Sequence, residues 1–157
     1  MVNSRRLLVT GGAGFIGTNF VQYWCGKYPD DRIVVLDALT YAGIQSNLAD
    51  LAIRFVHGNI CDRALVDSLL ATEEIDTIVH FAAESHVDRS ISSPAAFVQT
   101  NVSGTFTLLE AFRHHWETYS TARLLHVSTD EVYGSLDARE PAFTEPRAKP
   151  TSFMGGM

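Results

Sequence analysis

The chain has 157 residues, of which 46% are hydrophobic and 19% charged, and its formal net charge is −6. This composition predicts one folded domain with a sizeable core and argues against a disordered chain. The acidic balance argues against nucleic acids and anionic membranes as partners, because it leaves no basic face to meet phosphates.

Targeting and redox signals are sparse. No apolar run reaches the roughly 20 residues that a membrane helix needs, and the apolar stretch near the N-terminus is too short for a signal peptide. The two cysteines, Cys25 and Cys61, lack disulfide or metal-ligand spacing, so we expect both to be buried as small hydrophobic residues. We expect a cytoplasmic protein without a bound metal.

Short apolar runs rich in branched residues alternate with helical patterns, which predicts βα units around a parallel sheet. The expected strands are residues 6–10, 32–36, 54–57, 77–82 and 124–128. The expected helices are residues 14–26, a short one at 45–51, 62–71 and a long one at 94–116. Asp62 is expected to cap the third helix, and Pro94 to open the fourth.

The long fourth helix carries a wide apolar surface, which predicts burial on more than one side. Its apolar residues are Phe97, Val98, Val102, Phe106, Leu108, Leu109 and Phe112. Beyond Gly134 the periodicity ends and three prolines follow, so we expect a loop or tail from residue 135 to 157.

The turn between the first expected strand and helix is rich in glycine. In LLVTGGAGFIGTNF, Gly11, Gly14 and Gly17 separate strand from helix, and G-x-G-x-x-G is matched at residues 12–17. Dinucleotide-binding turns need glycine for the tight turn, for the approach of backbone amides to a pyrophosphate, and for close helix–strand packing. The helix N-terminus then directs partial positive charge toward the phosphates.

Asp37 ends the second expected strand about 20 residues after Gly17, where a carboxylate binds the ribose hydroxyls of a dinucleotide. It would repel a 2′-phosphate, so NAD is favoured over NADP. The alternative is an ordinary turn with Asp37 at the surface. The pattern predicts an α/β fold with a Rossmann-type doubly wound parallel sheet, truncated to about five strands.

Two acids, Asp130 and Glu131, follow the fifth expected strand in the motif STDEVYG. Adjacent carboxylates can divide acid and base roles when their surroundings separate their pKa values. The alternative is a solvated strand end. His86 and Asp88, in SHVDRS, have no partner at ligand spacing and are interpreted as part of a polar loop.

The motifs TGGAGFIG, AAESHVDRSI and STDEVYG, in this order, resemble the extended short-chain dehydrogenase/reductase family, and within it the nucleotide-sugar 4,6-dehydratases. LDALTYAG and TNVSGTFTLLEA extend the resemblance over residues 6–145. It implies a lyase of deoxysugar biosynthesis that acts on a dTDP-hexose with NAD as cofactor. Another nucleoside-diphosphate hexose stays possible as substrate.

The resemblance also implies roles for individual residues. Ser85 and Thr129 would contact the sugar nucleotide. Asn59 stands where the family usually has aspartate beside the adenine, and its side chain can still accept a hydrogen bond there. The residues implied in NAD binding are Gly11, Gly14, Phe15, Ile16, Gly17, Asp37, Ala38, Leu39, Thr40, Asn59, Ile60, Phe81, Ala82, Ala83, Glu84, Ser85 and Thr100.

In the family reaction, C4 of the glucosyl unit is oxidised with NAD as hydride acceptor, water is lost across C5 and C6, and the hydride returns to C6. Glu131 resembles the base that removes the C5 proton. Asp130 resembles the acid that protonates the leaving hydroxyl.

The family's Tyr-x-x-x-Lys pair belongs on the helix after STDEVYG, where this chain has RAKPTSFMGGM. Tyr23 and Lys27 match the spacing, but on the first helix, which Gly26 is expected to end before Lys27. We therefore expect residues 1–134 to form a partial NAD-binding domain, with the substrate domain absent and activity uncertain.

Three hypotheses remain open: a truncated dehydratase, a non-catalytic NAD-binding module that pairs with a partner protein, and an enzyme completed by a second chain. The resemblance also implies a possible homodimer through the long fourth helix.

Overall fold

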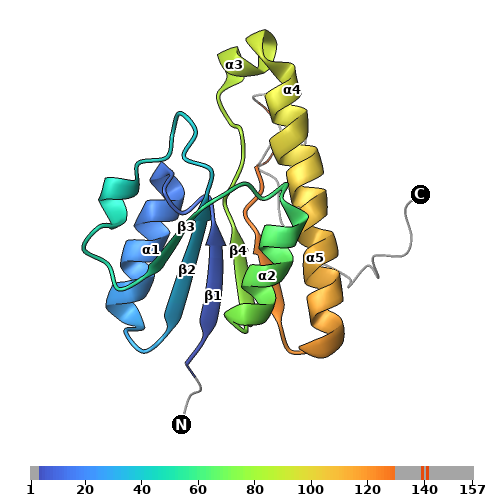
Figure 1. Cartoon of the computed structure of the whole chain (residues 1–157). Coiled ribbons are helices and arrows are strands. Elements are labelled where there is room, and N and C mark those ends of the chain that lie inside the picture. The colour runs from blue at the N-terminus through green and yellow to red at the C-terminus, as the bar shows by residue number, and fades with distance from the viewer. Residues whose placement is uncertain (1–3, 130–138, 140, 142–157) are drawn as a thin grey trace. The chain divides into compact units, whose positions relative to one another are not determined.

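The computed structural model describes residues 4–129, 139 and 141, and their contacts divide the chain into two units, Met1–Val127 and Ser128–Met157. All the helices and strands of the described residues lie in the first unit (Figure 1). The strands are β1 (Arg6–Thr10), β2 (Arg32–Asp37), β3 (Arg54–His57), β4 (Thr77–His80) and β5 (Arg123–His126). The helices are α1 (Phe15–Lys27), the 3₁₀ turn η1 (Gln45–Leu48), α2 (Arg63–Thr72), α3 (Val87–Ser92), α4 (Pro94–Phe97), the π-helical η2 (Val98–Gly104) and α5 (Thr105–Thr118).

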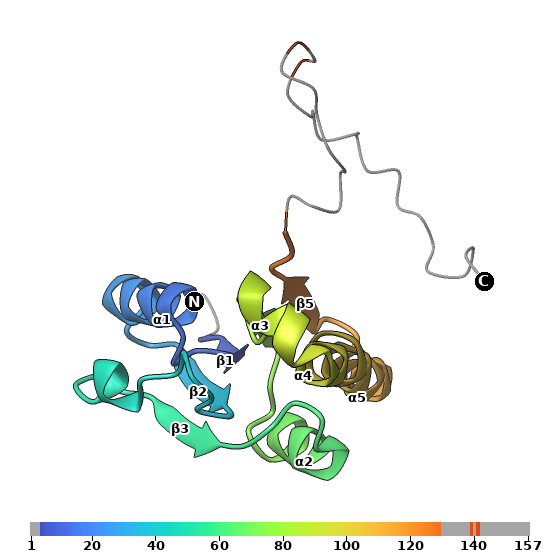
Figure 2. The ribbon, with the colours of Figure 1, turned by 90° about the horizontal axis from the view of Figure 1, so that it is seen from above.

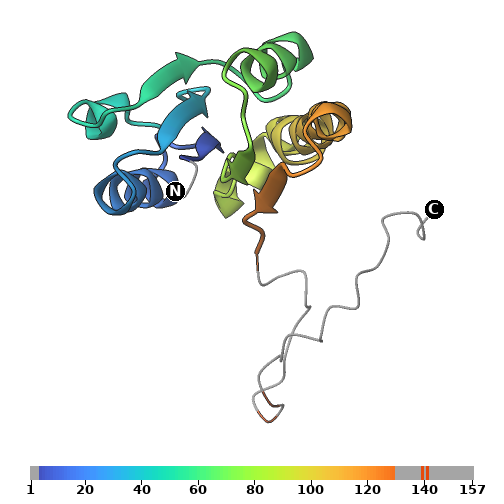
Figure 3. The same cartoon turned by 90° about the horizontal axis from the view of Figure 1, so that it is seen from below.

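The strands form one parallel sheet in the order β3-β2-β1-β4-β5. Leu8 of β1 lies in register between Val34 of β2 and Ile78 of β4. Helix α1 lies on one face of the sheet, and α2 and α5 lie on the other (Figures 2 and 3). A parallel sheet with helices on both faces (Figure 2) is the Rossmann-type arrangement, so the α/β prediction is confirmed.

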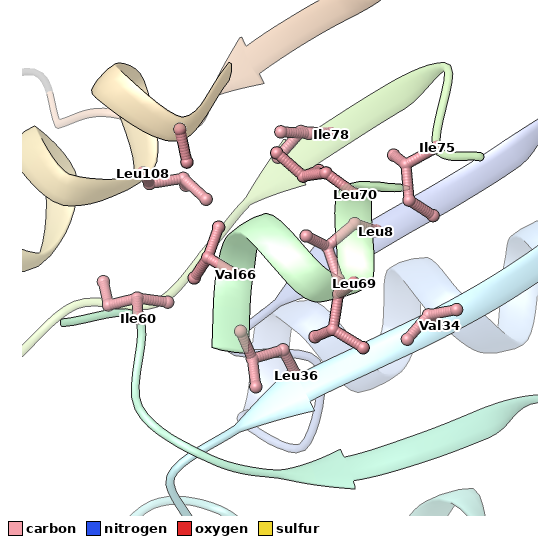
Figure 4. Close-up of a cluster of buried hydrophobic side chains, with 11 residues drawn as sticks. Leu8, Val34, Leu36, Ile60, Val66, Leu69, Leu70, Ile75, Ile78 and Leu108 are labelled. Carbon is pink, nitrogen blue, oxygen red and sulfur yellow. The ribbon is translucent and has the colours of Figure 1, made fainter. Parts of the chain in front are cut away.

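Alternate strand residues build two separate cores. On the side of α2 and α5, Leu8, Val34 and Ile78 pack with Leu69 and Leu108 (Figure 4). On the side of α1 the cluster consists of Leu7, Val9, Ala13, Val21, Ile33, Val35, Leu48 and Val79. The two-residue period of the strands therefore supplies both faces from the same short runs.

The edge at β5 is less covered. Leu124 packs against the core under α5, whereas Leu125, on the opposite face, is 56% exposed. Within residues 4–127, no element covers Leu125 as α1 covers Val35.

Several local predictions are confirmed. The Asp62 side chain caps α2 by accepting a hydrogen bond from the amide of Leu65 at 3.0 Å. Pro94 stands in the first turn of α4, and helical structure then continues without interruption to Thr118. Among the described residues, no helix has both the length and the apolar character to cross a bilayer.

Four expectations were wrong. Within the described residues the long fourth helix is not buried on more than one side, since Val98, Val102 and Phe106 are each more than half exposed. Residues Val87–Ser92 form the short helix α3 instead of a loop, with His86 as its N-cap. Helix α1 continues through Gly26 to Lys27. Cys25 and Cys61 are only partly buried, and the Cys61 thiol donates a hydrogen bond to the carbonyl of Gln99 at 3.2 Å.

Candidate functional site

The turn between β1 and α1 is packed so closely that three of its glycines have no room for a side chain. A Cβ on Gly12 would lie 2.7 Å from Cγ1 of Val35. Gly11 has a φ of 70°, and a Cβ there would lie 2.5 Å from the backbone nitrogen of Ala82. A Cβ on Gly17 would overlap the carbonyl oxygen of Gly11. A Cβ on Gly14 would meet that oxygen at an ordinary 3.4 Å. Gly11 and Gly17 therefore bring strand, loop and helix together, while Gly14 lines an open groove.

The N-terminus of α1 presents backbone amides at this turn. Phe15 and Ile16 direct their side chains to solvent, and Phe15 is 84% exposed. Gly14, the N-cap, has no side-chain oxygen to offer, and the first turn contains no acidic residue. The first amides of a helix have no intrahelical acceptor and carry the positive end of its dipole. This end of α1 therefore fits an anionic group such as a diphosphate.

Asp37, at the end of β2, is held by two backbone amides. Its Oδ2 accepts a hydrogen bond from the amide of Ala13 at 2.9 Å, and its Oδ1 accepts one from Leu39 at 2.8 Å. The side chain lines the groove. Each oxygen of a carboxylate can accept a second hydrogen bond. The groove therefore contains a fixed acceptor that is suited to a pair of hydroxyl groups.

The groove follows the carboxyl ends of β1, β2, β3 and β4 and is closed on one side by η2. The predicted residues that line it are Gly11, Gly14, Asp37, Ala38, Thr40, Asn59, Ile60, Phe81, Ala82, Ala83, Glu84 and Thr100. The predicted residues that do not line it are Phe15, Ile16, Gly17, Leu39 and Ser85.

Sequence reasoning missed four of the residues that line the groove: Leu36, Ala42, Gly43 and Gly58. The two glycines carried a signal, since each stands in a loop that directly follows a strand. A Cβ on Gly43 would lie 2.9 Å from Oδ1 of Asp37, and one on Gly58 would overlap Leu65.

The π-helical segment η2 is joined to the groove by a paired amide contact that the sequence did not suggest. Nδ2 of Asn101 donates to the carbonyl of Glu84 at 2.8 Å, and its Oδ1 accepts from the amide of Glu84 at 2.8 Å. Thr100, the preceding residue, lines the groove. The wider turn of a π-helix places one extra residue in the segment. Here Thr100 lines the groove, and the next residue, Asn101, binds the backbone of Glu84, which also lines it.

His80 connects the sheet to the start of α5. Its Nδ1 lies 2.6 Å from Oγ1 of Thr10, and its Nε2 lies 3.1 Å from Oγ1 of Thr105. Burial, together with the neighbouring His126, lowers the pKa of His80 to about 4. The imidazole is therefore neutral near pH 7 and serves as a hydrogen-bonded link between β1, β4 and α5.

The expected catalytic pair, Asp130 and Glu131, lies outside the described residues. Thr129 belongs to the second unit. Tyr23 and Lys27 are joined by a hydrogen bond of 2.6 Å, yet neither lines the groove. Their Tyr-x-x-x-Lys spacing places them at the end of α1 that is farther from the glycine turn.

A parallel sheet in this order, with a glycine turn at its first crossover and a carboxylate after β2, defines a Rossmann-type nucleotide-binding fold. The model of the GDP-mannose 4,6 dehydratase family matches residues 8–153, and the chain belongs to this family.

The individual proteins that the chain resembles include dTDP-glucose 4,6-dehydratases. The chain is 58% identical over 143 residues to a dTDP-glucose 4,6-dehydratase of Mycobacterium tuberculosis, covering 89% of this chain and 41% of that protein. The solved structure of a Bacillus anthracis dTDP-glucose 4,6-dehydratase in complex with NAD matches with a TM-score of 0.75 and 42% identity, over 90% of this chain and 43% of that one. A Streptomyces venezuelae dTDP-glucose 4,6-dehydratase with NAD bound matches with a TM-score of 0.73 and 54% identity, over 85% and 42% of the two chains. The chain thus spans about two fifths of the length of these relatives.

Proposed function

We propose that the chain binds NAD in the groove at the carboxyl ends of its strands and forms the cofactor-binding part of a dTDP-glucose 4,6-dehydratase. The observation that carries this proposal is the fixed carboxylate of Asp37 beside the open amides of α1, because a dinucleotide needs both. The relatives named above, two of which are described with NAD, support the same assignment.

The residues present fit the cofactor at three points. The first turn of α1 would receive the pyrophosphate, Asp37 would accept hydrogen bonds from the adenosine ribose, and the wall from Phe81 to Glu84 would support the rest of the dinucleotide. Bound NAD supplies a reversible hydride acceptor for the sugar. Phe15, Ile16, Gly17, Leu39 and Ser85 remain proposed neighbours of the cofactor, with Ser85 also near the sugar.

For the chemistry on the sugar, we propose the roles that the family resemblance implies. Glu131 removes the proton from C5, and Asp130 protonates the hydroxyl that leaves C6. Thr129 contacts the hexose. The test is an assay, by NMR of the sugar, for the loss of water from dTDP-glucose in the NAD-loaded chain. Turnover should be lost in the Glu131→Gln and Asp130→Asn variants. A chain that binds NAD without turnover would instead support the binding-module hypothesis.

NAD binding is tested by melting the full chain with NAD and, separately, with NADP. Mass action predicts about 2.7 kcal/mol of stabilisation at a hundredfold excess over Kd, which raises the melting temperature by several degrees. NADP should stabilise much less, because its 2′-phosphate would meet the carboxylate of Asp37. Equal shifts with both cofactors would contradict the assigned role of Asp37, and no shift with either would refute the proposal.

The long helical segment supports a homodimer as a second part of the proposal. Val98, Val102 and Phe106 recur every four residues, and all three are more than half exposed. Apolar side chains in such a row are stabilised by burial against a partner surface. Sedimentation of the chain should therefore show a dimer, and Val102→Lys should convert it to a monomer. A wild-type chain that is monomeric at all concentrations would refute this part alone.

A further inference from the structure

The two walls of the groove are joined by a contact between side chains. The guanidinium carbon of Arg89 lies 4.1 Å from the centre of the Tyr41 ring. The His86 ring meets the same tyrosine edge-on, with 6.3 Å between ring centres. Tyr41 belongs to the loop after β2, whereas Arg89 lies in α3 and His86 caps it.

The position of this contact links it to the groove. Thr40 and Ala42, on either side of Tyr41, line one wall, and Ala83 and Glu84, just before His86, line the other. Helix α3 lies beyond the carboxyl ends of the strands (Figure 1). The contact therefore joins the loop that carries one wall to the helix that follows the other wall, beyond the carboxyl ends of the strands (Figure 1).

We propose that Tyr41 and Arg89 form a clasp that slows the release of NAD from the groove. This inference rests on the proposed function and extends it from binding to retention. In a reaction that reduces and reoxidises the same cofactor within one turnover, the cofactor has no need to leave. A contact that must break before the walls separate acts on the dissociation rate more than on the association rate.

The expected size of the effect follows from the exposure of the pair. Tyr41 and Arg89 are both solvent-exposed, and exposed cation–π contacts are at the weak end of their range. Loss of the contact should therefore speed NAD release by roughly three- to fivefold.

The test measures the release rate of a fluorescent NAD analogue from the full-length chain after a chase with excess NAD. Arg89→Gln and Tyr41→Leu should each speed release by the stated factor, and the double variant should be no faster than either one. Arg89→Lys keeps the cation and Tyr41→Phe keeps the ring, so both should stay within about twofold of the wild type.

The chain offers a matched control. The Arg5 guanidinium lies 5.4 Å from the ring centres of both Trp24 and Tyr28. Arg5 directly precedes β1, so it lies at the amino ends of the strands, whereas the groove lies at their carboxyl ends. Arg5→Gln removes an exposed cation–π contact far from the groove and should leave the release rate unchanged.

Each outcome has a distinct meaning. Equal release rates in all variants of a chain that binds NAD would overturn the clasp and leave the proposed function standing. Additive effects of Arg89→Gln and Tyr41→Leu would also overturn it, since the residues would then act independently. A wild-type chain that binds neither NAD nor the analogue would refute the proposed function, and the clasp with it. If Tyr41→Leu fails to fold, Arg89→Gln still decides the question.

Discussion

The β1–β2 region and the β4–β5 region build their parts of the groove in different ways. Around β1, side chains of both faces are fully buried, and in the glycine turn Gly11 and Gly17 leave no space for an extra carbon. Around β5, one face is partly open at Leu125. Nearby, separate hydrogen bonds hold the structure: Asn101 binds the backbone of Glu84 in the groove wall, and His80 links β4 to the start of α5.

This difference teaches how one site can combine two kinds of constraint. Close packing holds the turn that would receive the phosphates, because any change of volume there displaces backbone. Polar contacts hold the wall after β4, where each bond contributes a limited amount and can be removed singly. We expect substitutions in the first region to affect folding, and those in the second to adjust the groove.

The largest effect is expected from Gly17→Ala. A methyl group there overlaps the carbonyl of Gly11, so we expect a loss of about 3 kcal/mol or more in the free energy of unfolding. Gly26→Ala, in the same helix, meets no atom within 4 Å and should stabilise by about 0.5–1 kcal/mol. Urea denaturation measures the free energy of unfolding of both variants. Similar free energies for Gly17→Ala and Gly26→Ala would show that the turn is less constrained than its geometry indicates.

The next comparison sets a covered leucine against an uncovered one. Leu8→Ala empties a fully buried position and should cost about 3–5 kcal/mol. Leu125→Ala, at the open face of β5, should cost less than about 1 kcal/mol. Equal losses would contradict the comparison, because Leu125 would then be buried in solution.

The lowered pKa of His80 predicts that the free energy of unfolding depends on pH. Its pKa is about 4 in the folded chain against 6.5 ordinarily, so the unfolded state binds a proton first as the pH falls. Stability should therefore decrease between pH 6.5 and pH 4, by up to about 3 kcal/mol, and then level off. Unfolding at a series of pH values should show this slope flattened in His80→Gln but kept in His114→Gln, on the exposed face of α5. An unchanged slope in His80→Gln would assign the pH dependence to other groups.

The smallest effect is expected at Asn101. Asn101→Ala removes two hydrogen bonds to the Glu84 backbone and should cost about 1–2 kcal/mol. Hydrogen exchange at the Glu84 amide should become faster, because its acceptor is gone. Gln99→Ala, a neighbouring exposed position in η2, keeps both bonds and should keep the protection. Equal exchange in the two variants would contradict the role of the Asn101 side chain in holding the Glu84 backbone.

The parts of the fold that depend on local pattern were predictable. The strands follow from short apolar runs, and the position of Asp37 follows from its distance to the glycine turn. The groove residues after β1, β2 and β4 follow from the same motifs. The sequence therefore indicates which edge of the sheet contains the site.

The parts that depend on distant contacts were not predictable. Helix α3 is short and has no apolar period, so the sequence alone leads to the interpretation of His86 and Asp88 as part of a polar loop. The link through His80 joins Thr10 to Thr105, far apart in the chain. The π segment also depends on partners elsewhere, among them Cys61 and Glu84. No local propensity encodes such partners.

The π-helical turn at η2 also makes the groove sensitive to deletions. A π-helical turn holds about one residue more than the 3.6-residue turn of an α-helix, and this extra residue is accommodated within the segment itself. Losing one residue from Val98–Gly104 would restore regular α-helical phase and turn Thr100 and Asn101 away from the groove while α5 stays packed. A reading-frame-preserving loss of one codon there would thus leave the sheet folded and remove one wall of its site.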